Sequence, residues 1–198
     1  MKGGDRRLET KTSVALQLLL NAHRLKHTPR TGWVIRGVPN AESVADHSFG
    51  VAIIALLLTE MMADLQLDRV KVLTIALLHD LPESITTDIP SPVMDHFPEH
   101  VKHQVETTVL AALLDRLPGA EQWQAWWQEF EDDDTREARL VHDADRLDML
   151  IQAYIYEQTT GNRWLDEFWS SSDESLFGFE VTAALYNELV MLRQASGC

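Results

Sequence analysis

The stretch Leu77-Leu78-His79-Asp80-Leu81-Pro82-Glu83 decides how the rest of the sequence is interpreted. It ends an apolar segment, residues 70–78, whose hydrophobic side chains cover nearly the whole circumference of a helix. Such a helix is expected at the centre of a domain, with Asp68 as its N-cap. The proline then turns the chain away from the helix axis. His79 and Asp80, both common metal ligands, are therefore predicted at a helix terminus that faces a cleft.

The pattern on both sides of this stretch is helical. Asn40 is the expected N-cap of the helix that precedes it. No alternating apolar and polar run predicts a strand, and no repeat or Pro/Ser-rich linker divides the chain. We therefore predict an all-α fold, with residues 1–198 forming one helical bundle. The expected helices cover residues 13–26, 40–64, 68–78, 99–117, 123–130, 135–160 and 174–194.

Composition limits the classes of function that suit this chain. A length of 198 residues fits one domain, and 45% hydrophobic residues are enough for a globular core. The formal net charge of −14 disfavours binding to a nucleic-acid polymer, because the phosphate backbone would be repelled. A small phosphorylated substrate stays possible, since a bound metal ion can reverse the local field of a pocket.

The sequence also predicts a cytoplasmic protein that does not bind membranes. Its single cysteine, Cys198, allows no internal disulfide, which suits a reducing compartment, and it is interpreted as an inert tail residue. No convincing secretory signal is present. The longest apolar run, residues 51–63, is interpreted as a buried helix too short to span a bilayer.

Two further segments place metal-ligand types beside apolar helix faces. His47 begins a helix that is otherwise apolar, and its ring nitrogens need partners there. Asp145 lies beside a stripe of apolar residues, where an acid is costly unless it is paired or bound to a metal. A salt bridge to an arginine such as Arg24 or Arg139 is the alternative for Asp145. A His-Asp pair in isolation would equally suit a hydrogen-bonded helix end.

Together these residues form an H…HD…D pattern that resembles the HD-domain metal-dependent phosphohydrolases. Residues 42–48 (ESVADHS), the stretch from Leu78 to Pro90 and residues 29–34 (PRTGWV) are similar to the 5'-deoxynucleotidase branch of that family. The resemblance covers about residues 13–170, and the C-terminal helix at residues 174–194 adds little to it. It implies a helical bundle around one divalent ion such as Mn²⁺, Co²⁺ or Mg²⁺.

The resemblance also implies roles for individual residues. The predicted metal ligands are His47, His79, Asp80 and Asp145, and the predicted catalytic acids are Glu83 and Asp88. Arg30 is expected to contact phosphate, with Arg36 as the alternative, and either arginine could instead be a solvated loop charge. Trp33, between them, either stacks on a base or packs under its loop.

We therefore predict an enzyme that hydrolyses nucleoside 5'-monophosphates, with a preference for the deoxy forms, and a small-molecule nucleotide as its only ligand besides the metal. A phosphodiesterase or a nucleotide pyrophosphohydrolase is the alternative, although its more anionic substrates would need more basic pocket residues. A non-catalytic binding module is a further alternative, which the presence of Glu83 and Asp88 argues against. The resemblance also implies a homodimer. The aromatic residues Trp123, Trp126, Trp127 and Phe130 are interpreted either as core or as its surface.

Overall fold

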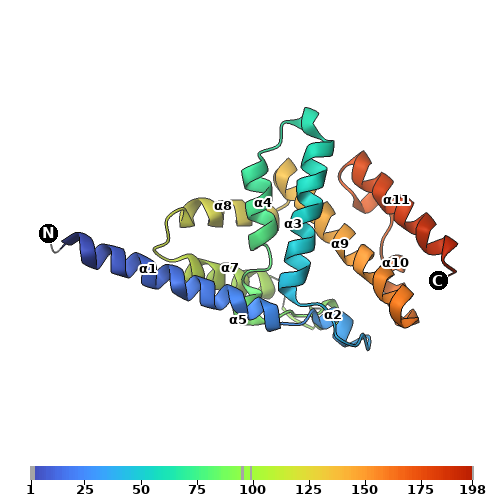
Figure 1. Cartoon of the computed structure of the whole chain (residues 1–198), viewed down its shortest axis with the longest axis horizontal. Coiled ribbons are helices and arrows are strands. Elements are labelled where there is room, and N and C mark those ends of the chain that lie inside the picture. Colours follow the sequence, from blue (N-terminus) through green and yellow to red (C-terminus); the bar gives the residue numbers. More distant parts are fainter. Residues whose placement is uncertain (1–2, 95, 99, 198) are drawn as a thin grey trace.

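The computed structural model describes residues 3–94, 96–98 and 100–197, with side chains from Lys11 onward. Throughout this part the chain is helical, and its only β-type pairing is an isolated antiparallel bridge between Pro29 and Ser43. The predicted all-α fold is therefore confirmed (Figure 1). Cys198 and Glu99, the expected first residue of one helix, lie outside the described residues.

The described helices follow one another in the order of the chain. They are α1 (Gly3–Ala22), η1 (His23–His27), α2 (Thr31–Val34), α3 (Val44–Met61), η2 (Ala63–Leu65), α4 (Arg69–Leu78), α5 (Glu83–Thr86), α6 (Ser91–Met94), α7 (Val101–Leu114), α8 (Ala120–Glu131), α9 (Arg136–Thr160), η3 (Arg163–Leu165), α10 (Asp166–Ser170), η4 (Glu174–Leu176) and α11 (Glu180–Ala195). Those labelled η are short 3₁₀ helices.

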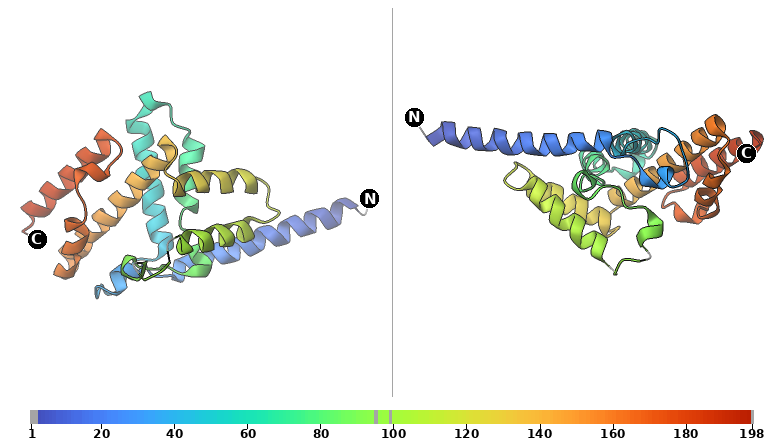
Figure 2. Two further views of the ribbon diagram at one scale, coloured as in Figure 1. Left: turned by 180° about the vertical axis from the view of Figure 1, so that it is seen from behind. Right: turned by 90° about the horizontal axis from the view of Figure 1, so that it is seen from below.

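Three helices, α3, α4 and α9, form the centre of the molecule. They pack extensively against one another, with α7 and α8 on one side and α10 and α11 on the other (Figures 1 and 2). Their inward side chains are fully buried and belong to one hydrophobic core. Those residues include Val51, Ala55, Leu58, Val72, Ile75, Ala76, Leu140, Ala144, Leu147 and Leu150. The prediction that the helix after Asp68 is central is therefore confirmed.

The N-caps show where local sequence decides the helix boundaries. Asp68 caps α4 as predicted, because its Oδ1 accepts hydrogen bonds from the backbone of Val70 and Lys71. The prediction of Asn40 as the cap of α3 was wrong. Ser43 caps that helix in a reciprocal capping box with Asp46. Asn40 has a positive φ of 53°, and the chain stays extended until Ser43.

The C-terminal region differs from the single helix predicted for residues 174–194. The short helix η4 ends at Leu176, and α11 begins only at Glu180. Between them the backbone N–H of Gly178 donates to both carboxylate oxygens of the buried Asp143, each at 3.0 Å. The hydroxyl of Thr182 donates to the same carboxylate. Satisfying this buried acid requires a turn in the chain, which interrupts the predicted helix.

The tryptophan-containing segment forms α8 and supplies core residues. Trp127 and Phe130 are buried, and the indole N–H of Trp127 donates to the backbone carbonyl of His79 at 3.0 Å. This contact joins α8 directly to the end of α4. The core interpretation of this aromatic stripe is therefore confirmed for these two residues.

Helix α3 is longer and more apolar than the sequence interpretation assumed. It spans 18 residues with a mean hydropathy of 1.5, so by length and composition alone it could cross a membrane. The expectation that this region is too short was wrong, because the helix begins at Val44, ahead of the apolar run. Only 39% of the residues in this helix are buried inside the molecule, so one side of the helix lies in the core and the other side is exposed.

The position of α9 in the core generates a stability prediction. Leu150→Ala should lower the free energy of unfolding by about 2–5 kcal/mol, because it leaves a cavity at a fully buried position. Leu192→Ala on α11, where the leucine is half exposed, is the matched control and should change it by less than about 0.5 kcal/mol. Urea unfolding followed by the helical circular dichroism signal measures both. Equal losses in the two variants would contradict the packing described here.

Candidate metal centre and catalytic pocket

Three of the predicted metal ligands converge at one point between α3 and the end of α4. The Nε2 atoms of His47 and His79 lie 3.4 Å apart. Oδ2 of Asp80 lies 3.3 Å from Nε2 of His79 and 3.7 Å from Nε2 of His47. Both imidazoles are buried, so these atoms are shielded from bulk water. The three residues form a group whose ligand atoms are close enough together to hold one ion.

Asp145 on α9 reaches the same point from the opposite side. Its Oδ1 lies 3.0 Å from Nε2 of His47, and its side chain is 36% exposed toward a cavity. Asp145 does not form the alternative salt bridge to Arg139, because Arg139 contacts Asp133 instead. All four residues predicted as ligands are therefore brought together by α3, α4 and α9.

The other ring nitrogen of each histidine is already occupied. Nδ1 of His47 lies 2.7 Å from Oδ2 of Asp148, and Nδ1 of His79 lies 2.9 Å from the backbone oxygen of Ala76. Each acceptor favours a proton on Nδ1, which leaves the Nε2 lone pair directed at the common point. The sequence interpretation assigned no role to Asp148. Its signal was its spacing, one helical turn beyond Asp145.

Close contact between α3 and α9 at Gly50 makes the Asp148 interaction possible. A Cβ atom on Gly50 would lie 2.0 Å from Oδ1 of Asp148. No side chain can occupy this position unless the carboxylate moves. Glycine is therefore required here by the approach of Asp148 to His47.

The pKa shifts within the cluster indicate an excess of negative charge that a bound cation would balance. Burial and Arg30 act to lower the pKa of His47, but hydrogen bonds to Asp145 and Asp148 outweigh them and raise it to about 10. Burial acts to raise the pKa of Asp80 and of Asp145, yet the neighbouring histidines and Arg30 hold both pKa values below their ordinary range. Two imidazole nitrogens and two carboxylates that converge in this way fit a divalent cation.

A cavity of about 280 Å³ opens beside the cluster. One part of its wall is polar and carries the candidate acids and arginines, and another part is apolar. Lys102, Met149 and Phe168 also line it, although the sequence interpretation gave none of them a role. The lining residues are Arg30, Gly32, Trp33, Arg36, Asp80, Glu83, Asp88, Ile89, Pro90, Ser91, Lys102, Asp145, Met149 and Phe168.

Glu83 is the more buried of the two predicted catalytic acids. Only 3% of the residue is exposed, and its Oε2 has no hydrogen-bond partner among the described residues. Burial, together with the carboxylates of Asp80 and Asp88, raises the pKa of Glu83 to about 9. A carboxyl group in this setting is protonated at neutral pH and can donate a proton into the cavity.

Asp88 is placed differently, against the loop that carries Arg30. Its carboxylate accepts a hydrogen bond from the backbone N–H of Thr31, and the hydroxyl of Thr31 donates to the Asp88 carbonyl at 2.9 Å. Thr87, with a positive φ of 62°, turns the chain immediately before it. Asp88 therefore lines the cavity and also fixes the position of the arginine loop.

The two candidate arginines have different surroundings. Nη1 of Arg30 lies 3.3 Å from Oδ2 of Asp80, so this guanidinium borders the ligand cluster. Arg36 pairs with Glu167 at 2.9 Å, donates to the carbonyl of Gly32 and lies over the ring of Phe168. Arg30 is the arginine closer to the candidate metal centre, and Arg36 helps to hold the apolar end of the cavity.

Trp33 is packed under its loop. It is only 2% exposed, its indole N–H donates to Glu42 at 2.9 Å, and its ring contacts Tyr156 and Phe168. These contacts leave no open ring face on which a base could stack. Of the two interpretations of Trp33, these contacts favour packing under the loop over base stacking, because they cover its ring and anchor the loop.

Comparisons with known proteins agree with this arrangement. Residues 22–178 match the family described as HD domain. The chain is 34% identical to 5'-deoxynucleotidase HDDC2 of Bos taurus over 184 residues, which cover 91% of this chain and 86% of that protein. It is 33% identical to 5'-deoxynucleotidase HDDC2 of Danio rerio over 172 residues, 86% of this chain and 84% of that protein.

Comparison with solved structures also finds proteins of the same fold. A conserved hypothetical protein from Pyrococcus furiosus superimposes with a TM-score of 0.76 at 39% identity, covering 90% of this chain and 99% of that one. A predicted metal-dependent phosphohydrolase from Magnetospirillum magnetotacticum superimposes with a TM-score of 0.70 at 25% identity, covering 96% and 95%. Because the family match spans most of the chain and carries its buried His and Asp residues, this protein belongs to the HD domain family.

Proposed function

We propose that this protein is a metal-dependent phosphohydrolase that converts nucleoside 5'-monophosphates, preferably deoxy forms, to nucleoside and phosphate. The main support is the convergence of His47, His79, Asp80 and Asp145 beside a cavity that also contains a protonated acid and an arginine. The names of the relatives from Bos taurus and Danio rerio support the choice of substrate.

His47, His79, Asp80 and Asp145 would hold one divalent ion. The mixed nitrogen and oxygen donors suit Mn²⁺, Co²⁺ or Mg²⁺. When bound, the ion supplies Lewis acidity that polarises a phosphoryl group. Asp148 and the carbonyl of Ala76 would keep the two imidazoles in the orientation that this role needs.

The remaining residues of the cavity would position the substrate and move protons. Arg30 neutralises charge on the phosphate oxygens. Water adds to phosphorus, and the bond between phosphorus and the 5'-oxygen breaks. Protonated Glu83 donates its proton to that leaving oxygen, so the nucleoside departs as an alcohol, and one proton of the added water returns to Glu83. Asp88 holds the loop of Arg30 and borders the same space.

The charge of the cavity favours a monophosphate over longer substrates. Three cationic side chains line it, but Arg36 is paired with Glu167 and Lys102 lies 3.6 Å from Glu106. A triphosphate would bring additional negative charge next to Asp80, Asp88 and Asp145, which line the cavity. This argues against the pyrophosphohydrolase alternative, and the unpartnered Oε2 of Glu83 argues against a non-catalytic binding module.

We also propose that the protein works in the cytoplasm and as a homodimer. The presence of one cysteine in 198 residues suits a reducing compartment. The homodimer follows from the family resemblance.

The metal assignment predicts a specific loss of bound metal. His79→Ala and Asp80→Ala should each abolish hydrolysis and lower the metal content of the purified protein, because each removes one converging ligand atom. His96→Ala, an exposed histidine outside the cavity, is the control and should retain both. Elemental analysis after dialysis measures metal content. Unchanged metal in both site variants would refute the ligand assignment.

Glu83 is predicted to transfer a proton and not to hold the metal. Glu83→Gln should keep the metal and the fold, while kcat falls by roughly two to four orders of magnitude. Glu157→Gln, a second buried glutamate that pairs with Arg193 away from the cavity, should leave kcat nearly unchanged. Steady-state kinetics with elemental analysis decide the matter. Near-normal turnover in Glu83→Gln would leave Asp88 as the acid.

The substrate proposal predicts a preference among nucleotides. The value of kcat/KM should be higher for dAMP than for dATP or 3'-dAMP. Loss of a charge-assisted hydrogen bond in Arg30→Ala should lower kcat/KM for dAMP by about 10- to 100-fold without loss of metal. Arg36→Ala, the matched control, should have a smaller effect because Arg36 pairs with Glu167 away from the ligand cluster, whereas Arg30 borders Asp80. A higher kcat/KM for dATP would favour the pyrophosphohydrolase alternative.

A further inference from the structure

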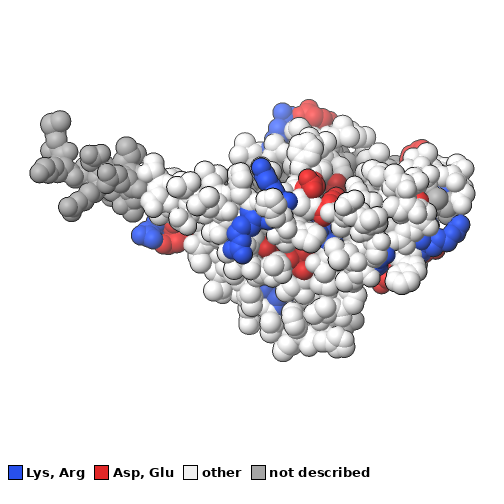
Figure 3. Space-filling model, turned by 60° about the horizontal axis from the view of Figure 1, so that its bottom comes forward, with Lys and Arg blue, Asp and Glu red and all other residues white. Residues whose placement is uncertain are grey.

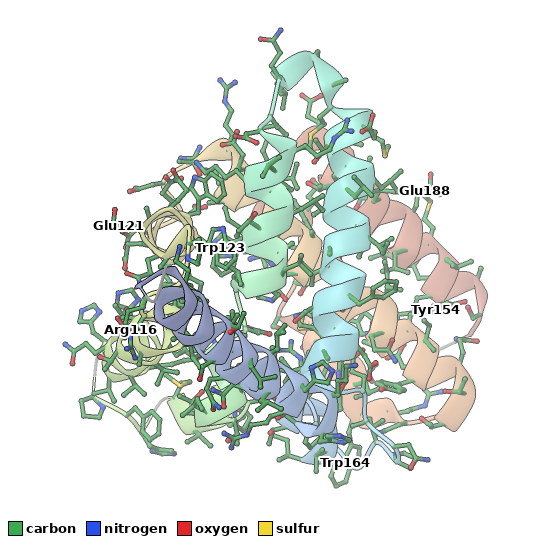
Figure 4. The ribbon with its side chains drawn as sticks, turned by 60° about the vertical axis from the view of Figure 1, so that its left-hand side comes forward. Arg116, Glu121, Trp123, Tyr154, Trp164 and Glu188 are labelled. Carbon is green, nitrogen blue, oxygen red and sulfur yellow. The ribbon has the colours of Figure 1, made fainter. Side chains whose placement is uncertain are left out.

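The proposed reaction assigns no role to one cationic side chain of the cavity. Lys102, the second residue of α7, lines the cavity together with Arg30, Asp80 and Glu83. Helix α5, which begins at Glu83, packs against α7 (Figures 1 and 4), and Arg116 marks the far end of α7 in Figure 4. Lys102 therefore reaches the cavity from the wall that α7 forms, whereas Arg30 reaches it from the loop before α2.

The side of the molecule that carries α5 contains charges of both signs. Figure 3 brings this side forward and shows Asp and Glu side chains near its middle, with Lys and Arg side chains close by. Burial acts to lower the pKa of Lys102, but nearby acidic side chains, Glu106 foremost, outweigh burial and raise that pKa. Lys102 is therefore a cation at neutral pH.

The stability of α7 does not account for a lysine at this position. Lys102 lies in the first turn of the helix, where the positive end of the helix dipole disfavours a cation. Its Nζ is 3.6 Å from Oε1 of Glu106, four residues later. In such pairs the order Lys before Glu is the less favourable one. The pair therefore adds little to the stability of α7, and the position of Lys102 needs another explanation.

The formal charges around the candidate metal centre leave a bound phosphate without a full set of counter-charges. A divalent ion would be balanced by Asp80 and Asp145, and the charge of Arg30 by Asp88, which lines the same cavity. A phosphate monoester carries nearly two negative charges at neutral pH, since its second pKa is about 6. Lys102 supplies positive charge that such a group needs.

We propose that Lys102 is a second phosphate-binding cation of the active site, which contacts the substrate phosphate from α7 while Arg30 contacts it from the loop before α2. An ammonium group has three N–H donors, so Lys102 can hold Glu106 and a phosphate oxygen at the same time. Glu106 is only 7% exposed and does not line the cavity, so it is a positioning residue for the lysine. Arg36 suits this role less well, because its ion pair with Glu167 holds it at the apolar end.

This inference rests on the proposed phosphohydrolase function and narrows the class of substrate. Lys102 and Arg30 together match the charge of one dianionic phosphate group. The site therefore suits phosphate monoesters, whereas a diester carries one negative charge and gains less from a second cation.

Calorimetric titration of the metal-loaded full chain with inorganic phosphate, after removal of unbound metal, tests the contact. Lys102→Met, an uncharged replacement of similar length, should weaken phosphate binding by about 10- to 100-fold, because a charge-assisted hydrogen bond is lost. Lys102→Arg keeps the charge and should restore most of the affinity. Lys26→Met, at an exposed lysine outside the cavity, is the matched control and should bind phosphate as the wild type does. Equal affinity of Lys102→Met and the wild type, or no phosphate binding by the wild type, would overturn the inference.

Kinetics and thermal unfolding separate a phosphate contact from a structural role. In Lys102→Met, kcat/KM for dAMP should fall by a similar factor, while metal content and the unfolding midpoint should not fall. Glu106→Gln retains the cation, so it should lose much less phosphate affinity than Lys102→Met. Equal losses in these two variants, or loss of metal or of thermal stability in Lys102→Met, would indicate a structural role and overturn the inference. A wild type that binds phosphate through Lys102 but does not hydrolyse dAMP would refute the proposed function and support this inference.

Discussion

Two buried imidazoles that face each other across 3.4 Å are the constraint on which the structure depends. Two carboxylates border the same point. Such a cluster is stable only if a cation occupies the centre or protons are taken up. Its geometry requires α3, α4 and α9 to meet there, and α8 secures the end of α4 through Trp127. The packing of α3, α4, α8 and α9 thus both buries Trp127 and places the four candidate metal ligands.

Much of this could be predicted from local sequence, because the relevant signals act over one or two helical turns. The apolar run that ends in His79-Asp80 and the Asp68 cap are such signals, whereas the H…HD…D order was predictable only through its resemblance to a known family. Contacts that depend on how distant helices approach were not predictable in the same way. Asp148 acts on His47 across 101 residues, and Trp33 is buried by Tyr156 and Phe168 from the far end of the chain. The Asn40 cap failed for a related reason, since the pairing of residues near 29 and 43 keeps the chain extended there.

Part of the negative charge of the chain is concentrated around the candidate site. Asp80, Asp88 and Asp145 all border one cavity, and Arg30 offsets only some of their charge. Repulsion among them costs stability in the absence of a cation, so metal binding and folding are linked: an ion that binds only the folded chain stabilises it.

The contact between Gly50 and Asp148 has a consequence for how this sequence can change over time. Any side chain at position 50 would collide with the carboxylate that orients His47. A substitution there is tolerable only together with a change at position 148, such as a longer acid that reaches the imidazole from farther away. The two positions lie on different helices and are far apart in the sequence, yet they should vary as a pair among related proteins. Aligned sequences would thus record the closeness of α3 and α9 without any structure.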